Sequence, residues 1–226
     1  MTHWALLCSP FLGPESWQPV VEPLRRLGHR ATVVSAPGES PDAVLDGLRS
    51  GLPGEGDLVL VPHSNAGLYV AALAAGANVT GVVFVDALLP GASGRTPVAA
   101  PALVEALEPL VEPDGRLPVW TRWWPGSDID GLFPGAAARA VVEAGQSRLP
   151  LAYLRGSVPT PTGWEQLPCG YLGFGDTYAD EQAIAAERGW PVDVLPGRHL
   201  HQLVDPEAVA ERVVALHGRG TRSAQS

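Results

Sequence analysis

Residues 58–75 read LVLVPHSNAGLYVAALAA, and this stretch decides the fold. Leu and Val alternate over 58–61, and a short run this apolar predicts a strand that is buried on both faces. Residues 65–75 are rich in Ala and Leu, which predicts a helix. Ser64 therefore lies in a tight turn between a buried strand and a helix. A turn of this kind can hold a serine hydroxyl above the ends of the strands.

The rest of the chain repeats this alternation of short β-branched runs and helical segments. Such a pattern is typical of a parallel sheet with helices on both faces. The predicted strands are residues 4–8, 31–35, 58–61, 81–85, 170–174 and 192–195. We therefore predict an α/β fold, doubly wound around a mainly parallel six-stranded sheet, with residues 1–226 forming one domain.

Residues 88–164 interrupt the alternation. This segment is rich in Pro, contains four of the seven Trp residues and shows no clear strand. Helices are predicted near 101–111 and 136–144, so we expect a mostly helical cap inserted into the sheet. At the other end of the chain, residues 218–226 are expected to be disordered.

The composition excludes several classes of function. The net charge of −9 opposes binding to the phosphates of nucleic acid. All fifteen basic residues are Arg, and this excludes chemistry that needs a lysine amine, such as Schiff-base formation. Cys8 and Cys169 have no metal-ligand spacing between them.

The chain is expected to be cytoplasmic. Its first residues lack a basic stretch followed by a long apolar one, which argues against secretion. Residues 64–85 carry no charge, but Gly76, Asn78 and Gly81 interrupt them, so we predict no membrane span. The expected partner is a small-molecule substrate, with the protein a monomer or homodimer.

The turn around Ser64 resembles a known motif. Pro62-His63-Ser64-Asn65-Ala66 is similar to the G-x-S-x-G nucleophile elbow of the α/β-hydrolase superfamily, with Pro62 and Ala66 in place of the two glycines. His199 lies where the superfamily places its catalytic histidine, in the loop after the last strand. The resemblance implies that Ser64 is the nucleophile and His199 the general base, with His201 as the alternative base.

The same resemblance implies an acid to hold the histidine. The superfamily pattern G-x-x-D fits residues 173–176, so Asp176 is the expected acid. The chain order Ser64, Asp176, His199 is then the superfamily's order of nucleophile, acid and histidine. Asp180, in the same loop region, is one alternative. Asp86 is another, because some members place the acid after the fourth strand.

The resemblance also implies two backbone N–H donors for an oxyanion. One belongs to Asn65, directly after the nucleophile. The other comes from the loop after the first strand, where Pro10 has no N–H to give. We therefore expect Phe11 to donate.

The cap segment is dense in aromatic residues. Trp120, Trp123 and Trp124 are expected to bind an apolar or aromatic substrate and to exclude water. The alternative is that these tryptophans fix the cap to the core.

The resemblance implies a serine hydrolase that cleaves an ester, thioester or lactone through an acyl-enzyme, without metal or cofactor. The chain is similar to small bacterial esterases and hydroxynitrile lyases of the superfamily. One alternative is a lyase or cyclase of secondary metabolism that uses the same Ser-His-Asp set as a proton relay. Another is a ligand-binding protein that keeps the fold without catalysis.

Overall fold

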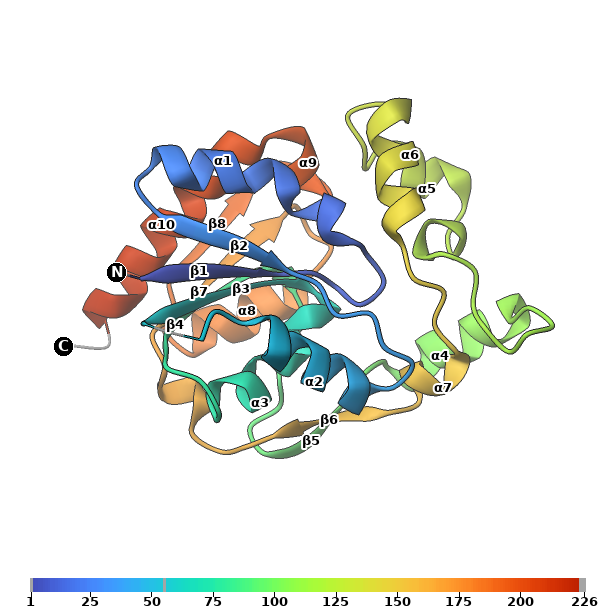
Figure 1. Ribbon diagram of the computed structural model, residues 1–226, viewed down its shortest axis with the longest axis horizontal. Coiled ribbons are helices and arrows are strands. Elements are labelled where there is room, and N and C mark those ends of the chain that lie inside the picture. Colours follow the sequence, from blue (N-terminus) through green and yellow to red (C-terminus); the bar gives the residue numbers. More distant parts are fainter. Residues whose placement is uncertain (1, 55, 224–226) are drawn as a thin grey trace.

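A six-stranded parallel sheet forms the centre of the molecule (Figure 1). The computed structural model describes residues 2–54 and 56–223. In the order of the sheet, the strands are β2 (Arg30–Val34), β1 (His3–Leu7), β3 (Leu58–Ser64), β4 (Val79–Ala87), β7 (Cys169–Phe174) and β8 (Val192–Leu195). The predicted doubly wound sheet of six strands is confirmed, and each predicted strand overlaps an observed one.

Helices cover both faces of the sheet (Figure 1). One face carries α1 (Gln18–Arg26), α9 (His201–Val204) and α10 (Pro206–Ser223). The other carries α2 (Pro41–Gly51), α3 (Val70–Ala74) and α8 (Ala179–Glu187).

Each face has its own core, because successive side chains of a strand point to opposite sides. In β3, Leu58 and Leu60 pack into the core beneath α2 and α3. Val59 and Val61 pack into the core beneath α1 and α10. The continuous apolar run that predicted a strand buried on both faces is therefore divided between two cores.

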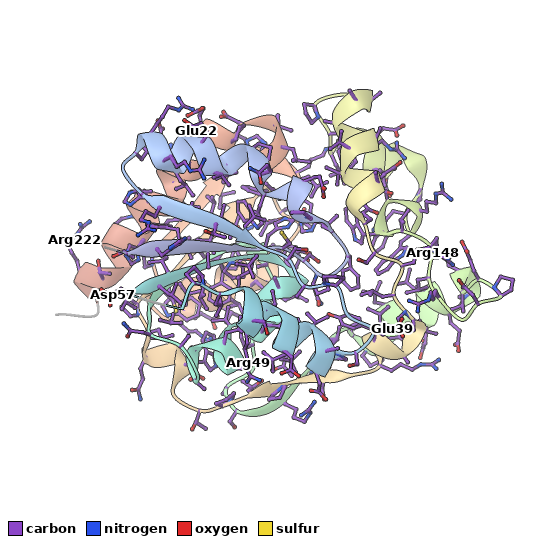
Figure 2. The ribbon with its side chains drawn as sticks, viewed as in Figure 1. Glu22, Glu39, Arg49, Asp57, Arg148 and Arg222 are labelled. Atoms are coloured by element: carbon purple, nitrogen blue, oxygen red, sulfur yellow. The ribbon has the colours of Figure 1, made fainter. Side chains whose placement is uncertain are left out.

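The helices of the insertion between β4 and β7 lie beyond the carboxyl ends of the strands (Figure 1). Its helices are α4 (Pro101–Leu107), α5 (Gly126–Asp130), α6 (Ala136–Gly145) and α7 (Leu151–Leu154). An ion pair between Arg116 of this cap and Glu39, just before α2, connects the cap to the core. Figure 2 shows Glu39 at the edge of the core that faces the cap.

The prediction that the cap contains no strand is wrong. β5 (Gly94–Pro97) pairs antiparallel with β6 (Ser157–Thr160). Both strands are four residues long and contain proline, which lacks the N–H that a strand donates, so their sequences carry almost no strand signal.

The expected disorder of 218–226 also differs from the structure. Helix α10 continues to Ser223, and only residues 224–226 lie outside the described part of the chain. Gly220 is buried, and a β-carbon there would come within 2.9 Å of the carbonyl oxygen of Cys169. The end of α10 is thus packed closely on β7 at Gly220. Within residues 2–54 and 56–223, no helix has the length and apolar character needed to cross a membrane.

Candidate active site

Ser64 ends β3 in a strained turn. Its φ of 58° and ψ of −130° lie in a region that residues other than glycine rarely adopt. The chain then enters a short 3-10 helix, Asn65–Tyr69. The N–H of Leu88 donates to the carbonyl oxygen of Ser64 at 3.1 Å, which ties the turn to the end of β4. The sharp strand-to-helix turn that the sequence predicted is therefore present at Ser64.

Asp86 occupies a bulge at the end of the neighbouring strand. In the register of β3 and β4, His63 lies opposite Val85 and Ser64 opposite Ala87, so Asp86 has no partner. Its φ of 42° is also unusual for a residue with a side chain. A bulge redirects the side chain that it carries. Here the bulge brings a carboxylate to the carboxyl ends of the strands, where Ser64 lies.

The bulge is held by hydrogen bonds from β7. The phenol of Tyr171 accepts from the N–H of Ala87 at 3.0 Å and donates to its carbonyl at 2.8 Å. The N–H of Phe174 donates to Oδ1 of Asp86 at 2.9 Å. The carboxylate of Asp86 is fully buried and is oriented by the strand beside it.

His199 lies in the loop between β8 and α9, where the sequence placed it. Its Nδ1 donates to Oδ2 of Asp86 at 2.6 Å. This bond fixes the tautomer, because a proton held on Nδ1 leaves Nε2 of the neutral ring as an acceptor. An acceptor nitrogen is what a general base requires. The alternative base, His201, begins α9 with its ring against Phe174, 5.5 Å between centroids, and is absent from the cavity wall.

The prediction that Asp176 holds His199 is wrong, because Asp86 is in that position. Asp176 follows β7 on the wall of the cavity with an exposed side chain. Asp180 is exposed in the first turn of α8. An exposed carboxylate would have to give up water to bind the ring, whereas Asp86 is already buried beside it. Asp86, the alternative after the fourth strand, is the partner of His199.

The hydroxyl of Ser64 lies near the phenol of Tyr178. Within the described residues this is the only hydrogen-bond partner of Oγ, at 3.5 Å. Ser64 and His199 line the same cavity without a hydrogen bond between them. Bonds of this type commonly shorten when a substrate binds. Tyr178 was not predicted from the sequence. The only feature that could have marked it as a site residue is its position two residues after Asp176.

A cavity of about 700 Å³ lies between Ser64 and the cap. Phe11 and Asn65 are on its wall, as are the three cap tryptophans that the sequence singled out. The remaining apolar lining comes from Leu88, Val98, Ala99, Ala100, Leu103, Ile129, Leu132 and Leu154. Charge is confined to Asp128, Asp176 and Arg198, which are all exposed. The lining of the cavity is thus mainly apolar, and its charged residues are exposed to solvent.

The three tryptophans differ in their surroundings. Trp123 is buried, packs edge-on against Phe11 at 4.9 Å and donates from Nε1 to the carbonyl of Pro118 at 2.8 Å. Trp120 lies against the ring of His199, with 5.7 Å between centroids. Trp124 is 39% exposed at the cavity wall. Trp123 therefore fixes the cap to the core, while Trp120 and Trp124 are available to a ligand.

Phe11 and Asn65, the residues of the two expected oxyanion donors, both line the cavity. In the part of the chain that the structure describes, the backbone N–H of Phe11 has no acceptor. The next amide, of Leu12, is occupied by the carbonyl of Ser9 at 2.9 Å. Phe11 can therefore supply the donor that Pro10 lacks.

A chain of buried hydrogen bonds fixes the side chain of Asn65. Tyr69 donates to the phenol of Tyr153 at 2.7 Å, and Tyr153 donates to Oδ1 of Asn65 at 2.9 Å. Nδ2 of Asn65 donates to the carbonyl of Val98 at 3.0 Å. Tyr153 also packs edge-on against Phe11, at 5.6 Å. Both expected oxyanion residues thus contact one tyrosine, Tyr153, which no pattern in the sequence marks.

His63 supports His199 from below. Its ring stacks on that of His199 at 4.6 Å, and its Nε2–H donates to the carbonyl of His199 at 2.8 Å. Burial, with a smaller contribution from the neighbouring His199, holds the pKa of His63 well below its usual value. His63 is therefore neutral in the folded protein, with Nε2 protonated.

This lowered pKa predicts a loss of stability in acid. Below pH 6.5 the unfolded chain gains a proton on His63 that the folded chain refuses, so the free energy of unfolding falls as the pH falls. The expected slope from this residue is about 1.4 kcal/mol per pH unit. His63→Gln keeps a side-chain N–H donor and removes the titration, so urea unfolding between pH 7 and 5 should show a shallower slope. Equal slopes in both proteins would contradict this account.

Metal binding has no support from the geometry. In residues 2–54 and 56–223, no three His, Cys, Asp or Glu side chains are grouped so that they could hold a metal ion.

Comparisons with known proteins identify the fold. No protein-family model and no curated protein sequence matches the chain. Among solved structures, an extracellular α/β-hydrolase from a Paenibacillus species is similar with a TM-score of 0.73 at 16% identity, over 96% of this chain and 99% of that one. A pyrethroid hydrolase from Sphingobium faniae is similar with a TM-score of 0.67 at 22% identity, over 96% and 97%. Tomato methylketone synthase I is similar with a TM-score of 0.66 at 15% identity, over 97% and 98%. The sheet order, the turn at Ser64 and these similarities together show that the chain has the α/β-hydrolase fold.

Proposed function

We propose that this protein is a serine hydrolase that cleaves an ester, thioester or lactone of a small apolar or aromatic molecule through an acyl-enzyme on Ser64. The observation that carries the proposal is the pairing of Nδ1 of His199 with the buried carboxylate of Asp86, beside a serine in a strained turn on the same cavity. The Paenibacillus and Sphingobium proteins, described as hydrolases, support the same class of reaction.

In the proposed reaction, Nε2 of His199 takes the proton of Ser64 while Oγ attacks the carbonyl carbon. Asp86 keeps the proton on Nδ1 and stabilises the positive charge that develops on the ring. The amides of Phe11 and Asn65 donate to the oxyanion, and His199 then returns the proton to the leaving oxygen. Water repeats the sequence to release the acid.

The substrate class follows from the cavity. Its wall is mainly apolar and includes Trp120 and Trp124, and its charged residues are exposed. Burial of each methylene contributes about 0.8 kcal/mol to binding, so a large apolar acyl group should bind more tightly than a small apolar one. A volume of about 700 Å³ is in the range of sites for drug-sized molecules.

The alternative is a lyase or cyclase that uses the serine, the histidine and the acid as a proton relay, and it was motivated by the missing N–H of Pro10. The amide of Phe11 has no acceptor within the described residues and can replace that donor. We therefore favour acyl transfer.

A panel of 4-nitrophenyl esters tests the proposal. The wild-type protein should hydrolyse them, with kcat/KM rising about tenfold or more from acetate to phenylacetate because the larger acyl group removes more apolar surface from water. Trp124→Ala should reduce this rise, whereas Val141→Ala, which replaces an exposed residue of α6 outside the cavity wall, should not. If the wild-type protein hydrolyses no ester, thioester or lactone, the proposal is wrong.

A further inference from the structure

The phenol of Tyr178 is a polar group of the cavity that the proposed reaction has not used. It lies in the loop between β7 and α8, 3.5 Å from Oγ of Ser64, and its ring centroid is 5.4 Å from that of His199. An O–H···O bond is usually 2.7–2.8 Å long, so this hydroxyl is close to the nucleophile without being bound tightly to it. Within the described residues the phenol has no second hydrogen-bond partner.

Sheet order places Tyr178 on the same side of Ser64 as His199. β3 carries Ser64 and has β1 as one neighbour and β4 as the other. Phe11 follows β1, whereas Tyr178 follows β7 and His199 follows β8, both beyond β4. The expected oxyanion donor from the Phe11 loop and the phenol of Tyr178 therefore approach the serine from opposite sides.

This arrangement separates two oxygens of a bound ester. If the carbonyl oxygen is bound by the amides of Phe11 and Asn65, the leaving oxygen must face His199, which protonates it. The position of Tyr178 beside His199 brings its hydroxyl to the leaving oxygen rather than to the oxyanion.

We propose that Tyr178 is a further catalytic residue, whose O–H donates a hydrogen bond to the leaving oxygen of the substrate. The role rests on the proposed function. As the bond between the acyl carbon and this oxygen breaks, the oxygen gains negative charge and then takes the proton from Nε2 of His199. Tyr178 keeps its own proton throughout, so the step needs no other reactant. The same hydroxyl can orient the water that later attacks the acyl-enzyme.

The state of the phenol agrees with a donor role. Burial raises the pKa of Tyr178 above its usual value, although the contact with Ser64 opposes the rise. The hydroxyl is therefore protonated at neutral and mildly alkaline pH. Hydrogen bonds to a charged acceptor are about twice as strong as neutral ones, so the bond strengthens as charge develops on the leaving oxygen.

The test compares two esters with the same acyl group and different leaving groups, the 4-nitrophenyl and the ethyl ester. Tyr178→Phe should lower kcat/KM for the ethyl ester by about 10- to 100-fold, because ethoxide depends on stabilisation by donors. The loss for the nitrophenyl ester should stay within about threefold, because nitrophenolate leaves readily without help. The phenylalanine ring keeps the packing, and an unchanged melting temperature would show that the fold is intact.

Tyr69→Phe is the matched control. It also removes a buried phenolic hydroxyl, which donates to Tyr153 and lies off the cavity wall. Any loss that it causes should be equal for the two esters. If Tyr178→Phe lowers both rates equally, the phenol positions Ser64 rather than the leaving group, and the proposal is overturned; no loss on either ester also overturns it. If the wild-type protein cleaves no ester, thioester or lactone at all, the proposed function itself has failed, which distinguishes the two outcomes.

Discussion

Asp86→Asn should lower kcat for ester hydrolysis by about 10⁴-fold, and Asp176→Asn should lower it by less than about tenfold. Asparagine has almost the shape of aspartate and can keep the hydrogen bond from the N–H of Phe174. Its amide carries no charge, however, and can itself donate to Nδ1 of His199. The ring would then hold its proton on Nε2, where it cannot accept a proton from Ser64.

The two substitutions form a matched pair, because both remove one carboxylate charge near the cavity. Asp86 is fully buried and bonded to His199, whereas Asp176 is exposed on the cavity wall without a hydrogen bond to the ring. Steady-state rates on one nitrophenyl ester, together with melting temperatures, are sufficient for the comparison. A large loss in Asp176→Asn with little loss in Asp86→Asn would mean that the loop after β7 supplies the acid during turnover.

Ser64→Ala should lower kcat by about 10⁴- to 10⁶-fold, because it removes the hydroxyl that forms the proposed acyl-enzyme. The small remaining rate would come from binding and from the oxyanion donors. The melting temperature should change little, since alanine keeps the β-carbon and the lost hydroxyl has only the long contact with Tyr178. Ester hydrolysis within tenfold of wild type, after contamination is excluded by a second purification, would mean that Ser64 is not the nucleophile.

Ser64 and His199 could be predicted from the sequence because contiguous residues mark both. The apolar run 58–61, the turn and the Ala-rich helix follow one another without interruption, and they place the serine at the end of a central strand. His199 follows the last short strand and precedes a helix that begins with proline, so its loop is equally well marked. The alternation of short apolar strands with helices predicted the parallel sheet in the same way.

Asp86 could not be chosen from the sequence, because its position depends on the register between two strands. In the sequence it only ends the apolar run 81–85, as a surface aspartate would. The bulge that directs it toward His199 exists only when β4 is paired with β3 and held by Tyr171 from β7. For the same reason the chain from Tyr69 through Tyr153 to Asn65, whose members are up to 88 positions apart, has no local signature.

Labelling with a small fluorophosphonate, followed by intact and peptide mass spectrometry, tests the central claim most directly. The reagent reacts with a serine only when a base activates it. Wild-type protein should gain one phosphonyl group, located on the peptide that contains Ser64, and Ser64→Ala should gain none. An unlabelled wild-type protein, or a label that persists in Ser64→Ala, would contradict the assignment of Ser64 as an activated nucleophile.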